Sequence, residues 1–211
     1  AAAERKITLM KVTGFDSPVG KGVVGKVDDG KLALGNAKFL TELGVDTSVL
    51  SADAEHLRGD GATAIYLAAN GKPAGVIAIA DPVKPTTPDA LKVLAEDGIR
   101  VVMLTGDNRT TAQAVGRRLG IAEVEAEVLP DQKSAVVEKL RREGRVVAMA
   151  GDGVNDAPAL AAAEVGIAMG TGADVAIESA GVTLLKGDLT GITQTGKLPE
   201  VLKSLTESLK W

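Results

Sequence analysis

The sequence contains no cysteine and very few aromatic residues. The lack of cysteine excludes disulfide bonds and thiolate-bound metal sites. Aromatic residues make up 2% of the chain and hydrophobic residues 45%, so the core must consist mainly of Ala, Val, Leu and Ile. Such a composition suits buried parallel strands that are covered by helices.

Concentrated positive charge and long apolar runs are also missing. The net charge is −4, and no stretch concentrates Lys and Arg, so we expect no nucleic-acid partner. No run approaches the roughly 20 apolar residues of a membrane helix, and no signal peptide is visible, so we expect a soluble chain. The single histidine, His56, lies in a polar helical stretch, and we expect it to be solvated.

Residues 1 to about 79 have the pattern of a small α+β unit. Asn70-Gly71 is typical of a hairpin turn, here between strands at residues 64–69 and 75–80. Further strands are predicted at residues 7–15, 23–29 and 31–36, and helices at residues 36–43 and 52–60.

From Asp81 onward, apolar strands alternate with helices. Alternation of this kind predicts a parallel sheet covered on both faces. Strands are expected at residues 100–104, 125–129, 146–150, 165–169 and 182–185, and helices at 88–96, 110–119, 131–142 and 157–163. Pro82 and Pro85 stiffen the segment 81–85, which is the natural boundary between the two units.

The first motif of chemical interest is Thr105-Gly106-Asp107, which follows an apolar strand and precedes a helix. Ligands of open α/β sheets bind at the carboxyl ends of strands, where a hydroxyl and backbone N–H groups hold phosphate oxygens. The alternative is an Asp/Asn turn that caps the helix near Thr110. The motif alone does not decide between the two.

A second motif, residues 151–158, repeats this arrangement. Asp152 and Asp156 follow a buried strand, with Asn155 between them and glycines on both sides of Asp152. Carboxylates together with water and phosphate are the ligands that Mg²⁺ prefers. The alternative is a turn in which Asp156 caps the next helix.

Lys133 lies between these motifs, in the first turn of a predicted helix. A cation is disfavoured there by the helix dipole, unless it faces an anion. Taken singly, a solvated lysine is the commoner explanation.

In this order, Thr105, Lys133 and Asp152 resemble the last three motifs of the haloacid dehalogenase-like phosphotransferases. The resemblance implies a phosphate-holding Thr, a charge-neutralising Lys and a Mg²⁺-holding Asp. The strings at residues 105–107 and 151–158 are similar to those of P-type ATPases, and residues 81–189 match that family almost continuously. The implied fold is a haloacid dehalogenase-like parallel sheet domain with a smaller α+β nucleotide-binding domain.

The first unit contains Gly20, Gly22 and Gly25 in a G-x-G-x-x-G pattern, but a predicted strand follows them. A dinucleotide-binding fold would need a helix there. The arrangement instead resembles the nucleotide-binding domain of heavy-metal pumps, which implies that these glycines, with Gly35 and Asn36, contact ATP. Residues 166–172 and 174–180 are similar to the copper-pump branch.

The resemblance implies an ATP- and Mg²⁺-dependent part of a copper-exporting pump, at the cytoplasmic face of a membrane. Its other partners would be the membrane and actuator domains of the pump. Residues 1–79 would form part of the ATP-binding domain, residues 80–190 the phosphorylation domain, and residues 191–211 an amphipathic helix that leads toward a membrane segment. Thr105, Gly106, Asp107 and Lys133 would be catalytic, Asp152 and Asp156 would bind the metal, and Asn155 would support them.

The 211 residues depart from the family at several points. They contain no Asp-Lys-Thr-Gly-Thr string, whose Asp accepts phosphate in such pumps, and no His-Pro pair. Thr193 occupies the place of the nucleophile in a superficial echo of that string, at residues 193–197. We therefore expect the chain alone to be inactive. Two alternatives remain open: a phosphatase with Asp81 as nucleophile, and a non-catalytic nucleotide-binding module.

Overall fold

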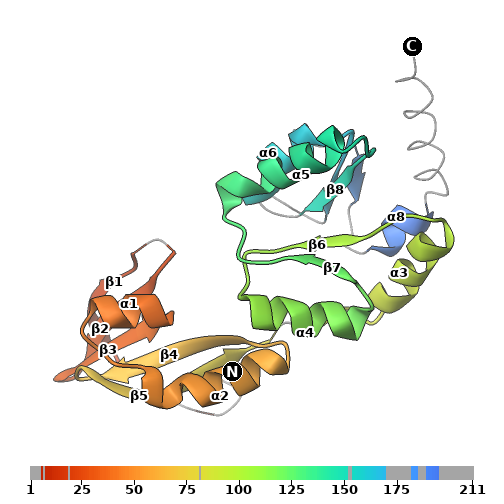
Figure 1. The fold of residues 1–211 in the computed structure, drawn as a ribbon. Helices are drawn as coiled ribbons and strands as arrows, with labels where there is room; N and C mark the ends of the chain where they lie inside the picture. Colours follow the sequence, from red (N-terminus) through yellow and green to blue (C-terminus); the bar gives the residue numbers. More distant parts are fainter. Residues whose placement is uncertain are drawn as a thin grey trace. The chain divides into compact units, whose positions relative to one another are not determined.

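The computed structural model divides into two compact units, Ala1–Asp81 and Pro82–Trp211 (Figure 1). It describes residues 6, 8–18, 20–80, 82–151, 154–169, 182–184 and 189–194. Each unit has its own sheet structure.

The first unit contains a five-stranded antiparallel sheet whose strands lie in sequence order. The strands are β1 (Val12–Asp16), β2 (Gly22–Val27), β3 (Gly30–Gly35), β4 (Thr63–Ala69) and β5 (Lys72–Ile79). The predicted turn at Asn70-Gly71 is confirmed, with φ of 51° and 75° at these two residues. Positive φ at both central residues is what a tight hairpin turn requires.

The first strand is shorter than the pattern at residues 7–15 predicted. β1 begins at Val12, which pairs with Val27, the last residue of β2. Beyond Val27 the chain turns at Asp28, where φ is 51°. Residues 8–11 therefore have no partner strand to pair with in β2, although their composition favours a strand.

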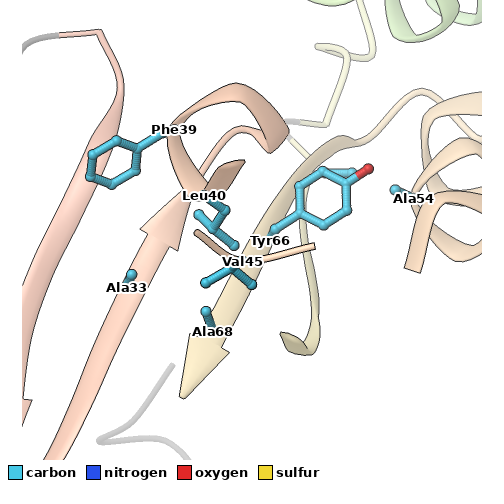
Figure 2. Close-up of a cluster of buried hydrophobic side chains, with 8 residues drawn as sticks. Ala33, Phe39, Leu40, Val45, Ala54, Tyr66 and Ala68 are labelled. Atoms are coloured by element: carbon cyan, nitrogen blue, oxygen red, sulfur yellow. The ribbon is translucent and has the colours of Figure 1, made fainter. Parts of the chain in front are cut away.

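Helices cover one face of this sheet and form its core with β4. They are α1 (Ala37–Glu42), a 3₁₀ turn η1 (Ser48–Leu50) and α2 (Ser51–Gly59). Every second residue of β4 is buried, as period-two alternation requires. Figure 2 shows Leu40, Val45 and Tyr66 gathered over β4, and Leu40 is completely buried.

Two glycines allow β2, β3 and α1 to approach closely. Gly22 pairs directly with Gly35. A Cβ atom on Gly22 would lie 2.1 Å from the carbonyl oxygen of Leu34, and one on Gly35 would lie 2.6 Å from Cδ1 of Phe39. Both distances are far below van der Waals contact, so a side chain at either position would force the backbone apart.

The second unit alternates helices and strands, as predicted. Its elements are α3 (Thr87–Glu96), β6 (Val102–Leu104), α4 (Arg109–Leu119), β7 (Glu123–Glu125), η2 (Pro130–Gln132), α5 (Lys133–Arg142), β8 (Ala148–Gly151), η3 (Val154–Asp156), α6 (Ala157–Ala162), β9 (Val165–Met169), β10 (Val182–Leu184) and α8 (Thr190–Gln194). All strand pairs described in this unit are parallel.

The described strands of this unit form two groups. β6 pairs with β7, and β8, β9 and β10 form a three-stranded sheet in the order β10-β9-β8. The prediction of a strand at residues 125–129 was wrong by a few residues, because β7 ends at Glu125. Glu127 has a φ of 62°, which a strand does not tolerate, and its N–H donates to the carbonyl of Asp107 (3.0 Å).

The core of the second unit centres on β9. Leu94 of α3, Val165 and Ile167 of β9, and Ile192 of α8 form a buried cluster. The predicted tail at residues 191–211 thus begins within α8. Its amphipathic part, residues 198–211, lies outside the described residues. Within the described part of the chain, no helix is long and apolar enough to cross a membrane.

We predict that Gly22→Ala destabilises the first unit by about 1–3 kcal/mol, because the new methyl group overlaps the Leu34 carbonyl. Urea unfolding followed through the amide NMR signals of β3 and β4 measures the effect. Gly75→Ala in β5 is the matched control, since its Cβ atom would meet nothing within 4 Å. Equal midpoints for the two variants would contradict the steric role of Gly22.

Candidate functional site

Directly after β6 the chain turns at Thr105, and hydrogen bonds hold this turn in place. The Thr105 backbone N–H donates to the carbonyl of Glu125 (2.9 Å), and its own carbonyl accepts from Val128 (3.1 Å). The hydroxyl donates to Oδ2 of Asp107 (2.8 Å) and accepts from the N–H of Asp107 (3.1 Å). Thr105 is half-buried, whereas Gly106 and Asp107 are exposed. The turn presents a hydroxyl and a carboxylate together at the strand end.

Asn108 begins the helix that follows this turn. Its Oδ1 accepts from the N–H of Thr110 (2.9 Å), and α4 starts at Arg109. The capping alternative is therefore correct for Asn108. It does not account for Thr105 and Asp107, which lie before the cap and bond to each other. Near the positive end of α4 the exposed Asp107 carboxylate is favourably placed.

Lys133 and Asp156 form a buried ion pair. The Lys133 Nζ lies 2.6 Å from Oδ1 of Asp156, and the two side chains are 17% and 10% exposed. The interpretation of Lys133 as a solvated lysine was wrong. Its position at the start of α5, unfavourable for a cation, is compensated by a carboxylate 23 residues further along the chain.

Asp156 is the N-cap residue of α6, as the alternative expected, but its side chain makes no capping hydrogen bond. Its carboxylate instead fits beside Gly151, the last residue of β8. A Cβ atom on Gly151 would lie 2.7 Å from Cβ of Asp156 and 2.9 Å from its Oδ2. Glycine at this position therefore makes room for the carboxylate at the strand end.

The donor atoms present here suit a hard cation only in part. Asp156 supplies a carboxylate and Asn155 is exposed, while Asp152 lies outside the described residues. In the described ranges no three His, Cys, Asp or Glu side chains gather in a metal-binding cluster. Oxygen donors of this kind fit Mg²⁺, which takes few protein ligands, but a cation would share Asp156 with the ammonium of Lys133.

In the first unit, the structure brings four of the predicted nucleotide-binding residues together. Gly20 and Gly22 flank Lys21, whose carbonyl accepts from the N–H of Asn36 (3.3 Å). Gly22 pairs with Gly35. The Asn36 Oδ1 accepts from the N–H of Phe39 (2.8 Å) and so caps α1.

Gly25 lies apart from this group, further along β2. A Cβ atom there would lie 2.7 Å from Cγ1 of Val12, so this glycine serves the packing of β1. Gly25 also lines a cavity of about 670 Å³ with Lys26 and Lys31, which form a cross-strand pair. The predicted set thus divides into four neighbouring residues and one at a different place on the sheet.

The glycine loop, residues 20–22, has a charged partner that the sequence did not reveal. The Lys21 Nζ lies 2.6 Å from Oε2 of Glu42, at the end of α1. The hydrogen bond from Lys21 holds the pKa of the Glu42 carboxyl below its ordinary value. No pattern links positions 21 and 42 in the sequence. In contrast, the expectation for His56 is confirmed, because its side chain is 81% exposed.

Comparisons with known proteins agree with this architecture. The haloacid dehalogenase-like hydrolase family matches residues 1–164. A silver exporting P-type ATPase of Salmonella typhimurium is 57% identical over 99% of the chain, which spans 26% of that protein. A copper-transporting P-type ATPase of Rhizobium leguminosarum bv. viciae is 53% identical over 99% of the chain, which spans 25% of that protein.

Solved structures that resemble this chain also come from heavy-metal pumps. The catalytic domain of the CPx-ATPase CopB-B, from a study of its conformational changes upon nucleotide binding, has a TM-score of 0.65 at 28% identity. The alignment covers 90% of this chain and 67% of that domain. A zinc-transporting PIB-type ATPase in its E2.Pi state has a TM-score of 0.67 at 30% identity, with 98% and 33% covered.

The chain belongs to the haloacid dehalogenase-like hydrolase family. Within it, the resemblance to the heavy-metal branch of the P-type ATPases is confirmed by the copper and silver pumps named above. The predicted fold class, a haloacid dehalogenase-like α/β domain with a smaller α+β domain, is confirmed as well.

We predict that Lys133→Met destabilises the second unit by about 3 kcal/mol, because it leaves the buried Asp156 carboxylate without its cation. The double variant Lys133→Met/Asp156→Asn should regain part of this loss, since the second change removes the buried negative charge. Urea unfolding followed through amide signals of β9 measures both.

The matched control is Glu123→Gln in the same unit. Glu123 pairs with Arg100 at 2.9 Å, but both side chains are 43% exposed, so the loss should stay below about 1 kcal/mol. If Lys133→Met costs no more than Glu123→Gln, the Lys133–Asp156 pair does not stabilise this unit.

Proposed function

We propose that this chain is the ATP- and Mg²⁺-binding part of a copper-type P-type ATPase, at the cytoplasmic face of a membrane. Such a pump couples ATP hydrolysis, through an aspartyl phosphate, to metal ion export. The observation that carries the proposal is the arrangement at the strand ends of the second unit. Thr105 and Asp107 follow the carboxyl end of β6 and bond to each other, and the Lys133–Asp156 pair lies beside Gly151 at the end of β8.

Phosphoryl transfer requires positioning and neutralisation of charge rather than covalent chemistry from many groups. In the proposed site, the Thr105 hydroxyl and the N–H groups of its turn hold phosphoryl oxygens, with Gly106 and Asp107 as part of the same turn. Lys133 neutralises charge on the phosphoryl group. Lys133 is already held by Asp156, so its ammonium is fixed in place before any ligand binds.

Asp152 and Asp156 are the proposed metal ligands, with Asn155 in support. Mg²⁺, when bound, would neutralise charge on the phosphoryl oxygens. Gly151 leaves the space into which the Asp156 carboxylate fits. The same glycine therefore serves both the ion pair and the proposed metal site.

The proposed nucleotide site is formed by Gly20, Gly22, Gly35 and Asn36, which are neighbours in the first unit. Gly25, which is also expected to contact ATP, lies further along β2, where it allows β1 to pack closely. Residues 1–79 then act as part of the ATP-binding domain and residues 80–190 as the phosphorylation domain, with residues 191–211 leading toward a membrane segment. The membrane and actuator domains of the pump are the proposed partners.

The 211 residues contain no Asp-Lys-Thr-Gly-Thr string, so we propose that the chain by itself does not turn over ATP. Copper as the cargo is supported by the motifs at residues 166–172 and 174–180 and by the relatives' names. The phosphatase alternative depends on Asp81, which lies outside the described residues. No observation favours it.

We predict that ATP binds the chain with a dissociation constant in the millimolar range, which corresponds to about 4 kcal/mol. In an NMR titration, the amide signals of Gly20, Gly22, Gly35 and Asn36 should shift together. Lys21→Gln, which removes a cation from the glycine loop, should weaken binding several-fold.

Lys72→Gln is the control for this titration, because Lys72 is an exposed lysine of β5 in the same unit. It should leave ATP binding unchanged. Submicromolar affinity, or shifts confined to other strands, would overturn the proposed nucleotide site.

We predict that divalent metal binding depends on Asp152 more than on any other residue. Mn²⁺ titrated in the presence of phosphate should broaden the Gly151 amide signal, and Asp152→Asn should abolish this broadening. Asp131→Asn, an exposed acid at the start of η2, is the control and should have no effect. Broadening that persists in Asp152→Asn would show that Asp152 is not a principal ligand.

A further inference from the structure

The first unit contains a cavity of about 670 Å³ that the proposed function does not use. Its lining includes residues of both tight turns of the sheet, Asp29 between β2 and β3 and Asn70 between β4 and β5. Gly22 and Gly35 of the proposed nucleotide site pair with each other at the opposite end of β2 and β3. Of the residues proposed to bind nucleotide, Gly25 alone lines the cavity.

The cavity exists because α1 covers only part of the sheet. α1 begins directly after β3, and both elements are 6 residues long. A helix of this length rises about 9 Å, whereas the strand extends about 20 Å. Phe39 of α1 contacts Gly35 at one end of β3, and the helix ends before it reaches Lys31 at the other. Within the described residues, no part of α1 or α2 lines the cavity.

The floor of the cavity is apolar. Val24 pairs with Ala33, and Ala33 pairs with Ala68, so these three side chains lie on one face of the sheet. Ala33, Val45 and Ala68 belong to the buried core of this unit (Figure 2). Leu43, which ends α1, also lines the cavity and is 47% exposed. A ligand with an apolar body would therefore remove apolar surface from water here.

Two lysines lie on this same face at the rim of the cavity. Lys26 of β2 is directly opposite Lys31 of β3. The Lys31 N–H donates to Oδ1 of Asn70 (2.8 Å), and the Lys31 carbonyl accepts from the N–H of Asn70 (2.8 Å). Both backbone groups of Lys31 therefore point toward β4, and Lys26 and Lys31 form a non-hydrogen-bonded pair, the kind whose side chains lie closest. Like charges in such a pair destabilise the sheet.

This positive charge is not neutralised within the described part of the chain. Neither Lys26 nor Lys31 forms a salt bridge with a described acid, in contrast to Lys21, which pairs with Glu42. Among the described residues that line the cavity, Asp29 is the single acid. Two lysines and one aspartate leave one positive charge, so the lining attracts a monoanion more than it attracts a polyphosphate.

We propose that this cavity binds a small amphipathic monoanion. A carboxylate or a phosphodiester group lies between the ammonium groups of Lys26 and Lys31, and an apolar chain covers Val24, Ala33 and Leu43. The bound anion removes the repulsion between the two lysines. Small-molecule sites of about 300–1,000 Å³ combine apolar walls with a few polar groups in the same way. The site goes beyond the proposed function, because it requires neither the glycine loop nor the second unit.

Octanoate is the probe, and the whole 211-residue chain is titrated with it and followed by NMR. The amide signals of Lys26, Lys31 and Ala33 should shift and reach saturation, whereas those of Gly22 and Gly35 should not move. Acetate lacks the apolar chain and octanol lacks the charge, so each should bind at least about tenfold more weakly than octanoate. No saturable shift at millimolar octanoate, or equal binding of octanol, would overturn the proposal.

The Lys26→Gln variant should move two measurements in opposite directions. Its affinity for octanoate should fall at least about threefold, because one of the two cations is lost. The urea midpoint of the ligand-free first unit should rise, because the repulsion with Lys31 is removed. Lys31→Gln should act in the same way. Lys38→Gln, at an exposed lysine of α1 outside the cavity, is the control and should leave the affinity for octanoate unchanged.

A fall of both the affinity and the midpoint in Lys26→Gln and Lys31→Gln would contradict the proposal, because it would show that these lysines only support the fold. Unchanged affinity in both variants would contradict it as well, since the anion would then lie elsewhere.

The anion has two possible sources, a free carboxylic acid and the headgroup of an anionic lipid, and sedimentation with vesicles distinguishes them. Sedimentation of the chain with phosphatidylglycerol vesicles but not with phosphatidylcholine vesicles, lost in Lys26→Gln/Lys31→Gln, assigns the site to a lipid. Octanoate binding without such sedimentation assigns it to a free acid. Sedimentation that persists in the double variant would contradict a lipid headgroup in this cavity.

An ATP competition separates this site from the proposed nucleotide site. ATP should not displace octanoate and should not shift the signals of Lys26 and Lys31. Displacement would show that the cavity is part of the nucleotide site, which would overturn the inference. If the octanoate titration fails while ATP still shifts the glycine loop, this inference is wrong and the proposed function is unaffected.

Discussion

The ion pair between Lys133 and Asp156 links the two groups of parallel strands in the second unit, β6–β7 and β8–β9–β10. Lys133 starts the helix that follows the β6–β7 group, and Asp156 follows β8 at the edge of the three-stranded sheet. Two opposite charges removed from water attract strongly, but each is costly to bury alone, so the arrangement persists only while both partners are in place. The pair links the start of α5 to η3, beside Gly151 at the end of β8.

Three glycines of this chain, Gly22, Gly35 and Gly151, serve its packing whether or not a ligand is bound. Gly22 and Gly35 let two strands and a helix approach, and Gly151 leaves space for a carboxylate. A backbone without side chains at a strand end is also what a phosphate or nucleotide needs for close approach. Structural and ligand-binding requirements thus favour the same residue at the same positions, and a glycine motif alone does not distinguish them.

Local chemistry allowed much of the fold to be predicted from the sequence. The Asn70-Gly71 turn and the alternation of strands and helices depend on neighbouring residues, and the structure confirms them. The capping turn before α4, left open as an alternative, is formed by Asn108. The limits of β7 were predicted wrongly because the left-handed conformation of Glu127 has no local signal in a glutamate. For Lys133 the sequence indicated only that a cation at a helix start needs an anion nearby; the identity of that anion could not be predicted, since it lies 23 residues away and only the tertiary fold brings the two together.

The two units differ in how their strands are connected, and this has a consequence for the order of folding. In the first unit, β2 pairs with β3 and β4 with β5 across turns at Asp28-Asp29 and Asn70-Gly71. In the second unit, every described pair is parallel and is joined through a crossover. Closing long loops before any contact forms slows folding, whereas local hairpins form in microseconds. We therefore expect the hairpins of the first unit to order first on the folding pathway and the parallel strands to assemble later.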